Sequence, residues 1–351
     1  MTATALYTRE DPNKSSKIVS RKASVDDLLG QELGESYDAY RERWEAAARF
    51  NQRPKFPIMI DFELNYSCNL KCPMCTWSTE QTVPGKNSWM DFDLFKRIVE
   101  EGVPKGLASI GLDWINEPTI RKDLPKFIKF AHDAGVIDSI VHSNGTLLTS
   151  VFADELIESG LTRMMFSLDA VSKETYEKIR IGADFDKVIR NVHDFIDRRR
   201  RKGRRLPLVS VNFVLMSINE DELNAFLDYW EPHVDFFVVQ QYMNPFENET
   251  AQDGRLFARS REVVPEFKCH QPWQRMTIRY DGRVLPCCSF YADQLVVGDV
   301  RHQSVEEIWN GMAMRQLQMM HARGEYFKNP VCLTCARNSV VNLTDEVLAQ
   351  S

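Results

Sequence analysis

The residues best suited to chemistry are three cysteines in one short segment, Cys68, Cys72 and Cys75, spaced as C-x3-C-x2-C. Thiolates are the ligands of iron–sulfur clusters, and a cubane [4Fe-4S] cluster takes four of them. Three thiolates therefore leave one iron of a cubane without a protein ligand. Because an open iron can chelate a small molecule, the spacing predicts a reactive cluster and not only an electron carrier.

Two other uses of clustered cysteines fit this segment less well. A structural zinc site needs four closed ligands, and the first histidines downstream, His132 and His142, do not have the spacing of a zinc knuckle. Disulfides belong to oxidising compartments, and residues 1–10 contain no apolar segment typical of a secretory signal. We therefore expect a cytoplasmic protein with reduced cysteines and an iron–sulfur site at the triplet.

A second set of cysteines stands near the end of the chain: Cys269, Cys287, Cys332 and Cys335, with Cys288 left over. Four thiolates can close a second cluster completely, so that none of its irons is open. Four thiolates suit a zinc ion as well, and the cysteines alone leave both metals possible. The iron content separates the two cases, because two cubanes contain about eight irons.

Apolar segments alternate with amphipathic ones between residues 56 and 239. Six strands are predicted, at 57–64, 107–113, 139–142, 163–168, 208–215 and 234–239. Helices are predicted between them, at 91–101, 122–134, 150–159, 173–179, 185–201 and 220–230. Strands in series with helices between them pair in parallel through right-handed crossovers. The expected fold is α/β, closed as a barrel, with a doubly wound sheet as the alternative.

The two ends of the chain are predicted to differ from this middle part. Residues 1–22 are polar and are expected to be disordered, whereas 25–50 carry apolar residues at helical spacing. Asp281-Gly282 indicates the turn of a β-hairpin, and Ser304 with Glu307 indicates a capping box. We expect three parts: an N-terminal helical and partly disordered extension at 1–55, a core at 56–245 and a small C-terminal domain at 246–351.

The composition argues against two classes of protein. The 351 residues include 44 basic and 50 acidic side chains, and the net charge of −6 argues against general nucleic-acid binding. No run of about eighteen apolar residues is present, so no membrane span is expected. The one basic block, at 198–205, is interpreted as the solvated C-terminus of a helix, where the helix dipole favours cations, rather than as a phosphate site.

The first cysteine segment resembles the signature of the radical S-adenosylmethionine (SAM) superfamily, C-x3-C-x-φ-C, with Met74 in the φ position. The resemblance implies a partial (β/α)6 TIM-like barrel and a SAM molecule bound to the open iron. One electron would then cleave SAM to a 5′-deoxyadenosyl radical, which abstracts hydrogen from an unactivated C–H bond. The protein would contribute positioning and the exclusion of competing reactants.

A segment after the second predicted strand, residues 113–118, resembles the Gly-Glu-Pro element of this superfamily. The resemblance implies that Glu117 accepts from the amino group of SAM, with Asn116 beside it. Asn116 stands where the family usually has Gly, and its backbone contact to SAM is therefore open. A carboxylate is the acceptor that an ammonium group needs.

The next two strand ends carry further similar elements. Ser143 and Asn144 resemble the superfamily's turn near the SAM ribose, which implies cofactor contacts there. Ser167, Asp169 and Arg180 resemble a Ser-x-Asp…Arg pattern, which implies contacts with the methionine, the ribose or the carboxylate of SAM. A helix cap or a surface ion pair is the equal alternative for these side chains.

The last third of the chain resembles a SPASM/twitch extension, on the hairpin at 275–286 and the terminal pair of cysteines. A full SPASM domain has more cysteines and two auxiliary clusters. The resemblance therefore implies the shorter twitch form, a β-hairpin plus helices with one auxiliary [4Fe-4S] cluster, held by Cys269, Cys287, Cys332 and Cys335. The cofactors implied are two [4Fe-4S] clusters and SAM.

Several relatives with one auxiliary cluster are aminocyclitol or aminoglycoside dehydrogenases and epimerases of antibiotic biosynthesis. The resemblance implies oxidation of a secondary alcohol of a sugar or aminocyclitol to a ketone, with the auxiliary cluster accepting the electron. An external donor such as flavodoxin or ferredoxin would supply the first electron. A redox-neutral epimerase with Cys288 as hydrogen donor is the alternative. A peptide-modifying SPASM maturase is a second alternative, although the first 55 residues are too short and too charged for the leader-binding domain common in such enzymes.

Substrate contacts are expected from the segment that follows the sixth predicted strand. Its polar side chains could hydrogen-bond a hydroxylated ring at the mouth of the barrel, and they are Gln240, Gln241, Tyr242 and Asn244. An ordinary strand exit is the equal alternative for this loop, and the residue that accepts the carbinol proton stays open at this point.

Overall fold

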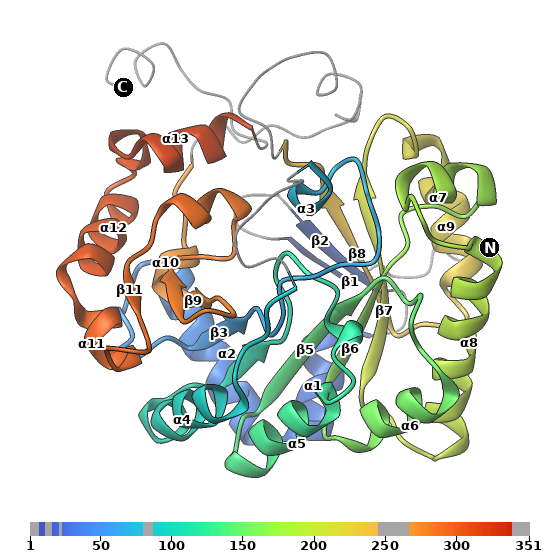
Figure 1. Ribbon diagram of the computed structural model, residues 1–351, viewed down its shortest axis with the longest axis horizontal. Coiled ribbons are helices and arrows are strands. Elements are labelled where there is room, and N and C mark those ends of the chain that lie inside the picture. The colour runs from blue at the N-terminus through green and yellow to red at the C-terminus, as the bar shows by residue number, and fades with distance from the viewer. Residues whose placement is uncertain (1–6, 11–15, 21–22, 80–86, 245–266, 339–351) are drawn as a thin grey trace.

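The structure is a computed structural model of the 351-residue chain, and it describes residues 7–10, 16–20, 23–79, 87–244 and 267–338. A single eleven-stranded sheet runs through these residues in the order β1-β2-β8-β7-β6-β5-β4-β3-β9-β10-β11 (Figure 1). Its centre consists of six parallel strands: β3 (Met59–Phe62), β4 (Ser109–Gly111), β5 (Asp138–Ser143), β6 (Arg163–Ser167), β7 (Leu208–Leu215) and β8 (Phe236–Gln241). All six predicted strands are therefore confirmed, as is the parallel α/β barrel class.

Helices connect these strands and cover the outer face of the sheet (Figure 1). They are α4 (Phe92–Gly102), α5 (Leu124–Ala134), α6 (Ser150–Glu158), α7 (Lys173–Ile179), α8 (Phe185–Arg201) and α9 (Leu223–Trp230). Four begin at a side-chain cap, as when Asp91 accepts from the backbone N–H groups of Asp93 and Leu94 at the start of α4. Such caps satisfy backbone donors that would otherwise have no partner, and they fix where each helix leaves its loop.

Side chains alternate between the two faces of each barrel strand. On β5, Val141 belongs to the large core that the outer helices share, whereas Ile140 belongs to a second core. This second core gathers residues at the amino ends of the strands, such as Met59 and Leu208, with residues of two N-terminal helices. The helices α1 (Val25–Leu33) and α2 (Glu35–Ala48) therefore close the amino-terminal end of the barrel.

The N-terminal prediction was wrong for two segments of residues 1–22, the rest of which lies outside the described residues, whereas the helical character of 25–50 is confirmed with one break. Disorder was expected over residues 1–22, but Tyr7–Glu10 (β1) and Ser16–Ser20 (β2) form an antiparallel pair, and β2 continues the sheet beside β8. The predicted helical stretch 25–50 is two helices, because Gly34 adopts a φ of 71° between them. Such a left-handed conformation ends a helix and is readily adopted only by glycine.

The C-terminal part is joined to the barrel through the same sheet. Strand β9 (Arg275–Ile278) pairs in parallel with β3 and forms the predicted hairpin with β10 (Arg283–Leu285), which in turn pairs with β11 (Gly298–Asp299). The capping box at Ser304 is present and opens α11 (Val305–Asn310). The remaining helices are α3 (Thr76–Thr79), α10 (Gln271–Gln274), α12 (Met312–Ala322) and α13 (Pro330–Arg337).

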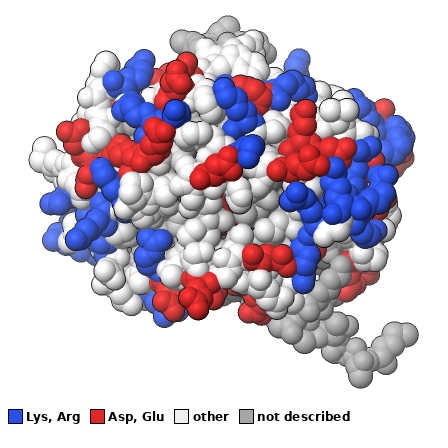
Figure 2. Space-filling view, turned by 90° about the horizontal axis from the view of Figure 1, so that it is seen from below, with Lys and Arg blue, Asp and Glu red and all other residues white. Residues whose placement is uncertain are grey.

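Charges of both signs are intermixed on the face drawn in Figure 2. The basic block at the end of α8 takes part in ion pairs, in which Arg198 contacts Asp154 and Asp194. The prediction of a fully solvated helix end was wrong for Arg199, which is buried and paired with Asp235 at 2.5 Å. Within the described residues, no helix has both the length and the apolar character needed to cross a membrane.

Phe95 on α4 offers a test of the outer core. Its side chain is fully buried, with ring centroids of Phe62 and Phe127 at 4.7 and 5.0 Å. Phe95→Ala is expected to lower the free energy of unfolding by about 3–5 kcal/mol, because the cavity would be only partly filled. Val151→Ala, at a residue 69% exposed on α6, is the control and should change it by less than about 0.5 kcal/mol. Anaerobic denaturant unfolding measures both, and equal effects would contradict the assignment of this core.

Candidate active site

The three cysteines of the first segment lie in the loop that follows β3, at the carboxyl ends of the barrel strands. Cys72 is buried, and Cys68 and Cys75 are half-buried. All eight cysteines of the chain are free thiols. Active sites of parallel barrels are built at this end, because the loops after the strands meet there. The structure therefore brings the triplet to the position that a reactive centre requires.

Neighbouring strand ends hold this cysteine loop on two sides. Asn69, between the first two cysteines, donates to Thr146 Oγ1 at 2.8 Å and accepts from Asn144 Nδ2 at 3.0 Å. On the other side, the backbone N–H of Lys71 donates to the carbonyl of Ile181 at 2.9 Å. Fixed hydrogen bonds of this kind position the three thiols before any metal is bound.

The chemistry of these thiols fits an iron–sulfur cluster. Burial raises the pKa of Cys68 to about 12 and that of Cys75 to about 11, so their thiolates are unfavourable unless a metal compensates the charge. Arg180 Nη1 lies 3.8 Å from Cys72 Sγ and offers a further cation. No three of the described His, Cys, Asp and Glu side chains are arranged to hold one metal ion. A cubane instead takes each thiolate on a separate iron, and its ligands stand further apart.

Glu117 connects the cysteine loop to two barrel strands. Its side chain is almost fully buried, and its carboxylate accepts from Ser143 Oγ at 2.8 Å, from the Asn144 N–H at 2.7 Å, and from the backbone and hydroxyl of Thr119. Its own N–H donates to the Ser67 carbonyl at 2.8 Å. Burial raises the pKa of Glu117, although these hydrogen bonds oppose the rise. Among the residues that the structure describes, one donor reaches Oε2, which leaves this oxygen a lone pair for an ammonium group.

The other predicted SAM contacts on β4 and β5 surround Glu117. Asn116 accepts from the N–H of Trp114 at 2.8 Å and donates to Asn65 Oδ1 at 2.9 Å, so its side chain stabilises the loop in place of the usual Gly. Ser143 and Asn144 are both buried and both donate to Glu117. The structure thus brings these four predicted residues together beside the cysteine loop.

Asp169 and Arg180, two further predicted SAM contacts, form an ion pair with each other. Asp169 is fully buried, has a φ of 66°, and accepts from the N–H of Val214 at 2.7 Å. Its carboxylate raises the pKa of Arg180 against the effect of burial and aims the guanidinium at Cys72. Ser167 is half-buried at the end of β6. The structure places Arg180 beside the cysteine loop, with Asp169 as the group that orients it.

The auxiliary cysteines come together from three segments. Cys269 precedes α10, Cys287 follows β10, and Cys332 and Cys335 lie on α13. Burial raises the pKa values of all four thiols, and the charges of neighbouring cysteines raise them further. They form a half-buried set of donors whose thiolate chemistry a second cluster fits.

Polar groups surround this auxiliary set. Ser289 Oγ lies 3.4 Å from Cys335 Sγ, and His321 Nε2 lies 3.4 Å from Cys332 Sγ. Burial lowers the pKa of His321 to about 4, so its ring is neutral at physiological pH. Groups of this kind orient the thiolates of a metal site and tune it.

Cys288 lies where the auxiliary set meets the barrel. Its carbonyl accepts from Trp114 Nε1 at 2.8 Å, and Trp114 follows β4. Its Sγ lies 3.8 Å from Gln271 Oε1. The hydrogen bond from Trp114 therefore joins the loop after β4 to the segment that carries Cys287 and Cys288.

The inner face of the barrel carries two charged pairs, and neither pairing was identified from the sequence. Asp61 on β3 pairs with Arg275 on β9 at 3.2 Å, and Asp113 after β4 pairs with His142 on β5 at 3.0 Å. Gly111 lies between them, and a Cβ at this position would stand 2.5 Å from Asp61 Oδ1. His142 lies on the face of β5 opposite to Val141, and Asp113 lies just past the end of β4. The alternation of side chains between the two faces of a strand is the signal that could have revealed the pair.

The predicted substrate residues lie at the end of β8 and just after it. Gln240 is exposed and Gln241 half-buried, whereas Tyr242 and Asn244 are buried. Tyr242 packs in a small apolar cluster with Met74 of the cysteine loop. The backbone of Asn244 bonds to Asn338 and to the Tyr291 hydroxyl, and so joins the barrel to the C-terminal part. The structure brings Tyr242 to the site and uses the Asn244 backbone as a connection.

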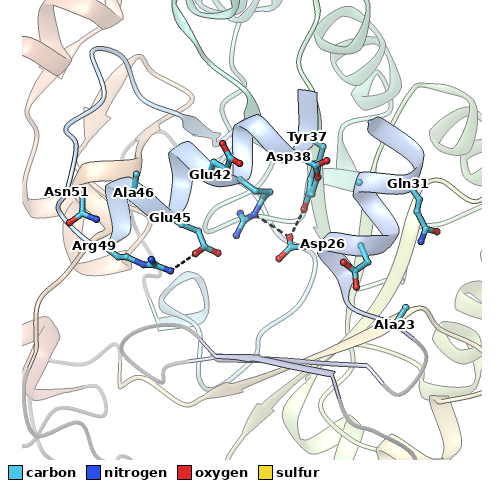
Figure 3. Close-up of a pocket in the computed structure, with 13 residues that line it drawn as sticks. Ala23, Asp26, Gln31, Tyr37, Asp38, Glu42, Glu45, Ala46, Arg49 and Asn51 are labelled. Atoms are coloured by element: carbon cyan, nitrogen blue, oxygen red, sulfur yellow. Dashed lines mark hydrogen bonds and ion pairs between the residues drawn. The ribbon is translucent and has the colours of Figure 1, made fainter. Parts of the chain in front are cut away.

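A hollow of about 820 Å³ lies elsewhere, against α1 and α2 (Figure 3). Its polar lining is largely satisfied within itself: Asp26 accepts from the Tyr37 hydroxyl at 2.8 Å and contacts Arg41, and Glu45 pairs with Arg49. These helices cover the amino ends of the strands, so the hollow is at the opposite end of the barrel from the cysteine triplet. We do not assign chemistry to it.

Comparisons with known proteins agree with this geometry. Residues 62–229 match the family model of the Radical SAM superfamily, and residues 269–336 match that of an iron–sulfur cluster-binding domain, SPASM. A probable GTP 3′,8-cyclase of Methanococcus maripaludis strain C5 is 32% identical over 253 residues, covering 63% of this chain and 81% of that protein. The PqqA peptide cyclase of Bradyrhizobium diazoefficiens is 27% identical over 321 residues, covering 80% of this chain and 78% of that protein. The match to the solved structure of BtrN in complex with AdoMet and 2-DOIA covers 80% of this chain and 92% of that chain. The TM-score is 0.52 and the sequence identity is 20%, so the two proteins share the fold.

The ligand sets can be tested by iron content. Cys72→Ala is expected to lower the iron of anaerobically reconstituted protein from about eight to about four atoms per chain, because a cubane does not assemble on two thiolates. Cys288→Ala is the matched control and should keep about eight, because the other four auxiliary thiols remain. Iron and sulfide analysis with electron paramagnetic resonance measures both. A Cys288 variant that loses half of its iron would contradict the ligand set.

Proposed function

The chain belongs to the radical SAM superfamily, and from the contents of its barrel we propose that it oxidises a secondary alcohol of a sugar or aminocyclitol to a ketone. Its cofactors are SAM and a [4Fe-4S] cluster, with further iron–sulfur ligation in the SPASM domain. We also propose that residues 56–245 form the catalytic core and 246–351 the auxiliary-cluster domain. Residues 1–55 are then an N-terminal addition to the barrel.

Cys68, Cys72 and Cys75 would hold the first cluster. When bound, this cluster with SAM supplies a radical that can remove a hydrogen atom from carbon. Glu117 Oε2, with one donor from the protein, is placed to accept from the SAM ammonium. Arg180, directed by Asp169, supplies positive charge near Cys72 for a carboxylate. Asn116, Ser143, Asn144 and Ser167 support these contacts.

The observation that carries the proposal is the contact between the barrel and the auxiliary cysteines. Trp114, which follows β4, donates to the carbonyl of Cys288, and Thr277 of β9 donates to the carbonyl of Cys287 while Arg275 of the same strand pairs with Asp61 inside the barrel. Loss of a hydrogen atom and a proton from a carbinol leaves one electron to be removed. An acceptor held by Cys269, Cys287, Cys332 and Cys335 would lie directly behind the substrate.

The polar interior supports a hydroxylated substrate. Asp61, Arg275, Asp113 and His142 line the inner face as two pairs, and each can accept from or donate to a hydroxyl or amino group. Gln240, Gln241, Tyr242 and Asn244 are proposed to contribute at the rim. Small-molecule sites of this kind use a few placed polar groups to fix orientation. An external electron donor such as flavodoxin or ferredoxin would reduce the first cluster.

The proposal is tested by incubating reconstituted protein with SAM, dithionite and a panel of aminocyclitols and sugars in deuterated buffer, with GTP and the PqqA peptide alongside. A ketone formed in a one-to-one ratio with 5′-deoxyadenosine is the expected product. Mass spectrometry measures both. Cys72→Ala is the control and should form neither product.

Three outcomes would overturn alcohol oxidation. A substrate that gains one solvent deuteron at an unchanged oxidation level indicates the epimerase, with Cys288 as its hydrogen donor. Conversion of GTP, as the name of the M. maripaludis relative suggests, indicates a nucleotide cyclase. A modified peptide with an unchanged sugar panel indicates a maturase of the kind that the B. diazoefficiens relative represents.

A further inference from the structure

His142 is an ionisable side chain of the barrel interior to which no role has yet been given. Its backbone N–H donates to Asp113 Oδ1 at 2.9 Å, and its ring Nδ1 lies 3.0 Å from Asp113 Oδ2. A carboxylate acceptor at Nδ1 selects the tautomer that carries its proton there. The lone pair of the neutral ring is then on Nε2, and no hydrogen bond to Nε2 is present within the described part of the chain.

The ring of His142 is open to the interior. Its neighbours Val141 and Ser143 are buried, and Val141 belongs to the outer core, so His142 points to the inner face of β5. Although the residue lies deep in the barrel, 41% of its side-chain surface is accessible to solvent. This combination is expected of a side chain that lines a cavity, where a substrate hydroxyl can reach Nε2.

Charged groups from four other elements face this ring. Asp113 follows β4, Asp61 on β3 is paired with Arg275 on β9, and Arg163 on β6 is paired with Asp138 on β5 itself. Burial disfavours the imidazolium and Arg163 opposes it, but Asp113 outweighs both, and the pKa of His142 is raised above 6.5. The ring can therefore take up a proton near physiological pH and hold it beside Asp113.

We propose that His142 Nε2 accepts the hydroxyl proton of the carbinol, with Asp113 as the positioning residue. The inference rests on the proposed alcohol oxidation. The carbon-bound hydrogen leaves as an atom to the radical derived from SAM, and the O–H proton goes to Nε2. The remaining electron goes to the iron–sulfur acceptor of the C-terminal cysteines. The C–O single bond becomes the C=O bond of the ketone, so atoms and electrons balance.

Other carboxylates of the site are less suitable. Asp61 is engaged by Arg275, and Glu117 accepts from groups of three residues. Glu63 pairs with Arg279 and keeps one oxygen without a hydrogen bond, but its side chain is completely buried and a substrate cannot reach it. His142 combines a basic atom with access to the interior, which these groups lack.

The state of the ring can be measured without turnover. Diethyl pyrocarbonate modifies neutral, accessible imidazole, and peptide mass spectrometry of the reconstituted holoenzyme follows modification of His142 against pH. We expect modification with a midpoint above pH 6.5 in the wild type. Asp113→Asn should move the midpoint to lower pH, because the carboxylate that favours the imidazolium is gone. An unmodified His142, or a midpoint that Asp113→Asn leaves unchanged, would overturn the inference.

The catalytic test uses the member of the sugar panel that the wild type oxidises, deuterated at the carbinol carbon. His142→Gln should still transfer deuterium to 5′-deoxyadenosine, but ketone formation should fall by about 10²–10⁴-fold, the usual effect of losing a general base. Wild-type ketone formation should rise with pH through the raised pKa of His142, and the variant should lose this dependence. His132→Gln, at an exposed residue of α5, is the matched control and should behave as wild type.

The two proposals fail in different ways. If the wild type makes no ketone from any carbinol, both are overturned. If the wild type makes ketone and His142→Gln keeps its rate and pH profile, only the role of His142 is overturned. Iron content and SAM binding confirm that the variant is intact, and the modification experiment on wild-type protein does not depend on how the variant folds.

Discussion

The buried carboxylate of Glu117 is the interaction on which the rest of the site depends. The backbone N–H of Glu117 donates to the Ser67 carbonyl in the loop of the cysteine triplet, and its carboxylate accepts from Ser143 and Asn144 at the end of β5. Hydrogen bonds to a charged group contribute roughly 1.5–3 kcal/mol each, and a buried carboxylate that lost them would carry a large desolvation cost. The position of the thiols is therefore determined by the barrel itself, before a cluster is present.

The need to pair buried charges also explains the inner face of the barrel. Buried charges are tolerated when they are paired and hydrogen-bonded, and two inward-facing carboxylates have a cationic partner on a neighbouring element, Arg275 for Asp61 and Arg279 for Glu63. Gly111 makes room for the Asp61 carboxylate, which any side chain would displace. The result is a polar lining with fixed orientations, which a substrate meets without the protein having to reorganise.

The sequence was informative where local patterns determine structure. Apolar runs identified all six barrel strands, and the capping box at Ser304 identified a helix start. It failed for β1 and β2, because a short polar hairpin becomes a strand only by pairing with β8, far along the chain. It also missed His142 and its pairing with Asp113, since the ion pair joins two strands and His142 belongs to no recognisable motif. The pairing of Asp169 with Arg180 was likewise left open between a cofactor contact and an ion pair.

The relation between the two cysteine sets follows from the continuity of the sheet. Strand β9 extends the barrel in parallel with β3, so the C-terminal part is attached to the barrel by backbone hydrogen bonds. Arg275 and Arg279 reach from β9 into the barrel, while Thr277 between them donates to the carbonyl of Cys287 at 3.0 Å. One strand thus contributes both to the polar lining of the barrel and to the support of Cys287. Because β3 also leads directly into the first cysteine loop, the paired strands β3 and β9 connect the segments that carry the two sets of cysteines. In the proposed oxidation, this connection would hold an electron acceptor in a fixed position relative to the first cysteine loop.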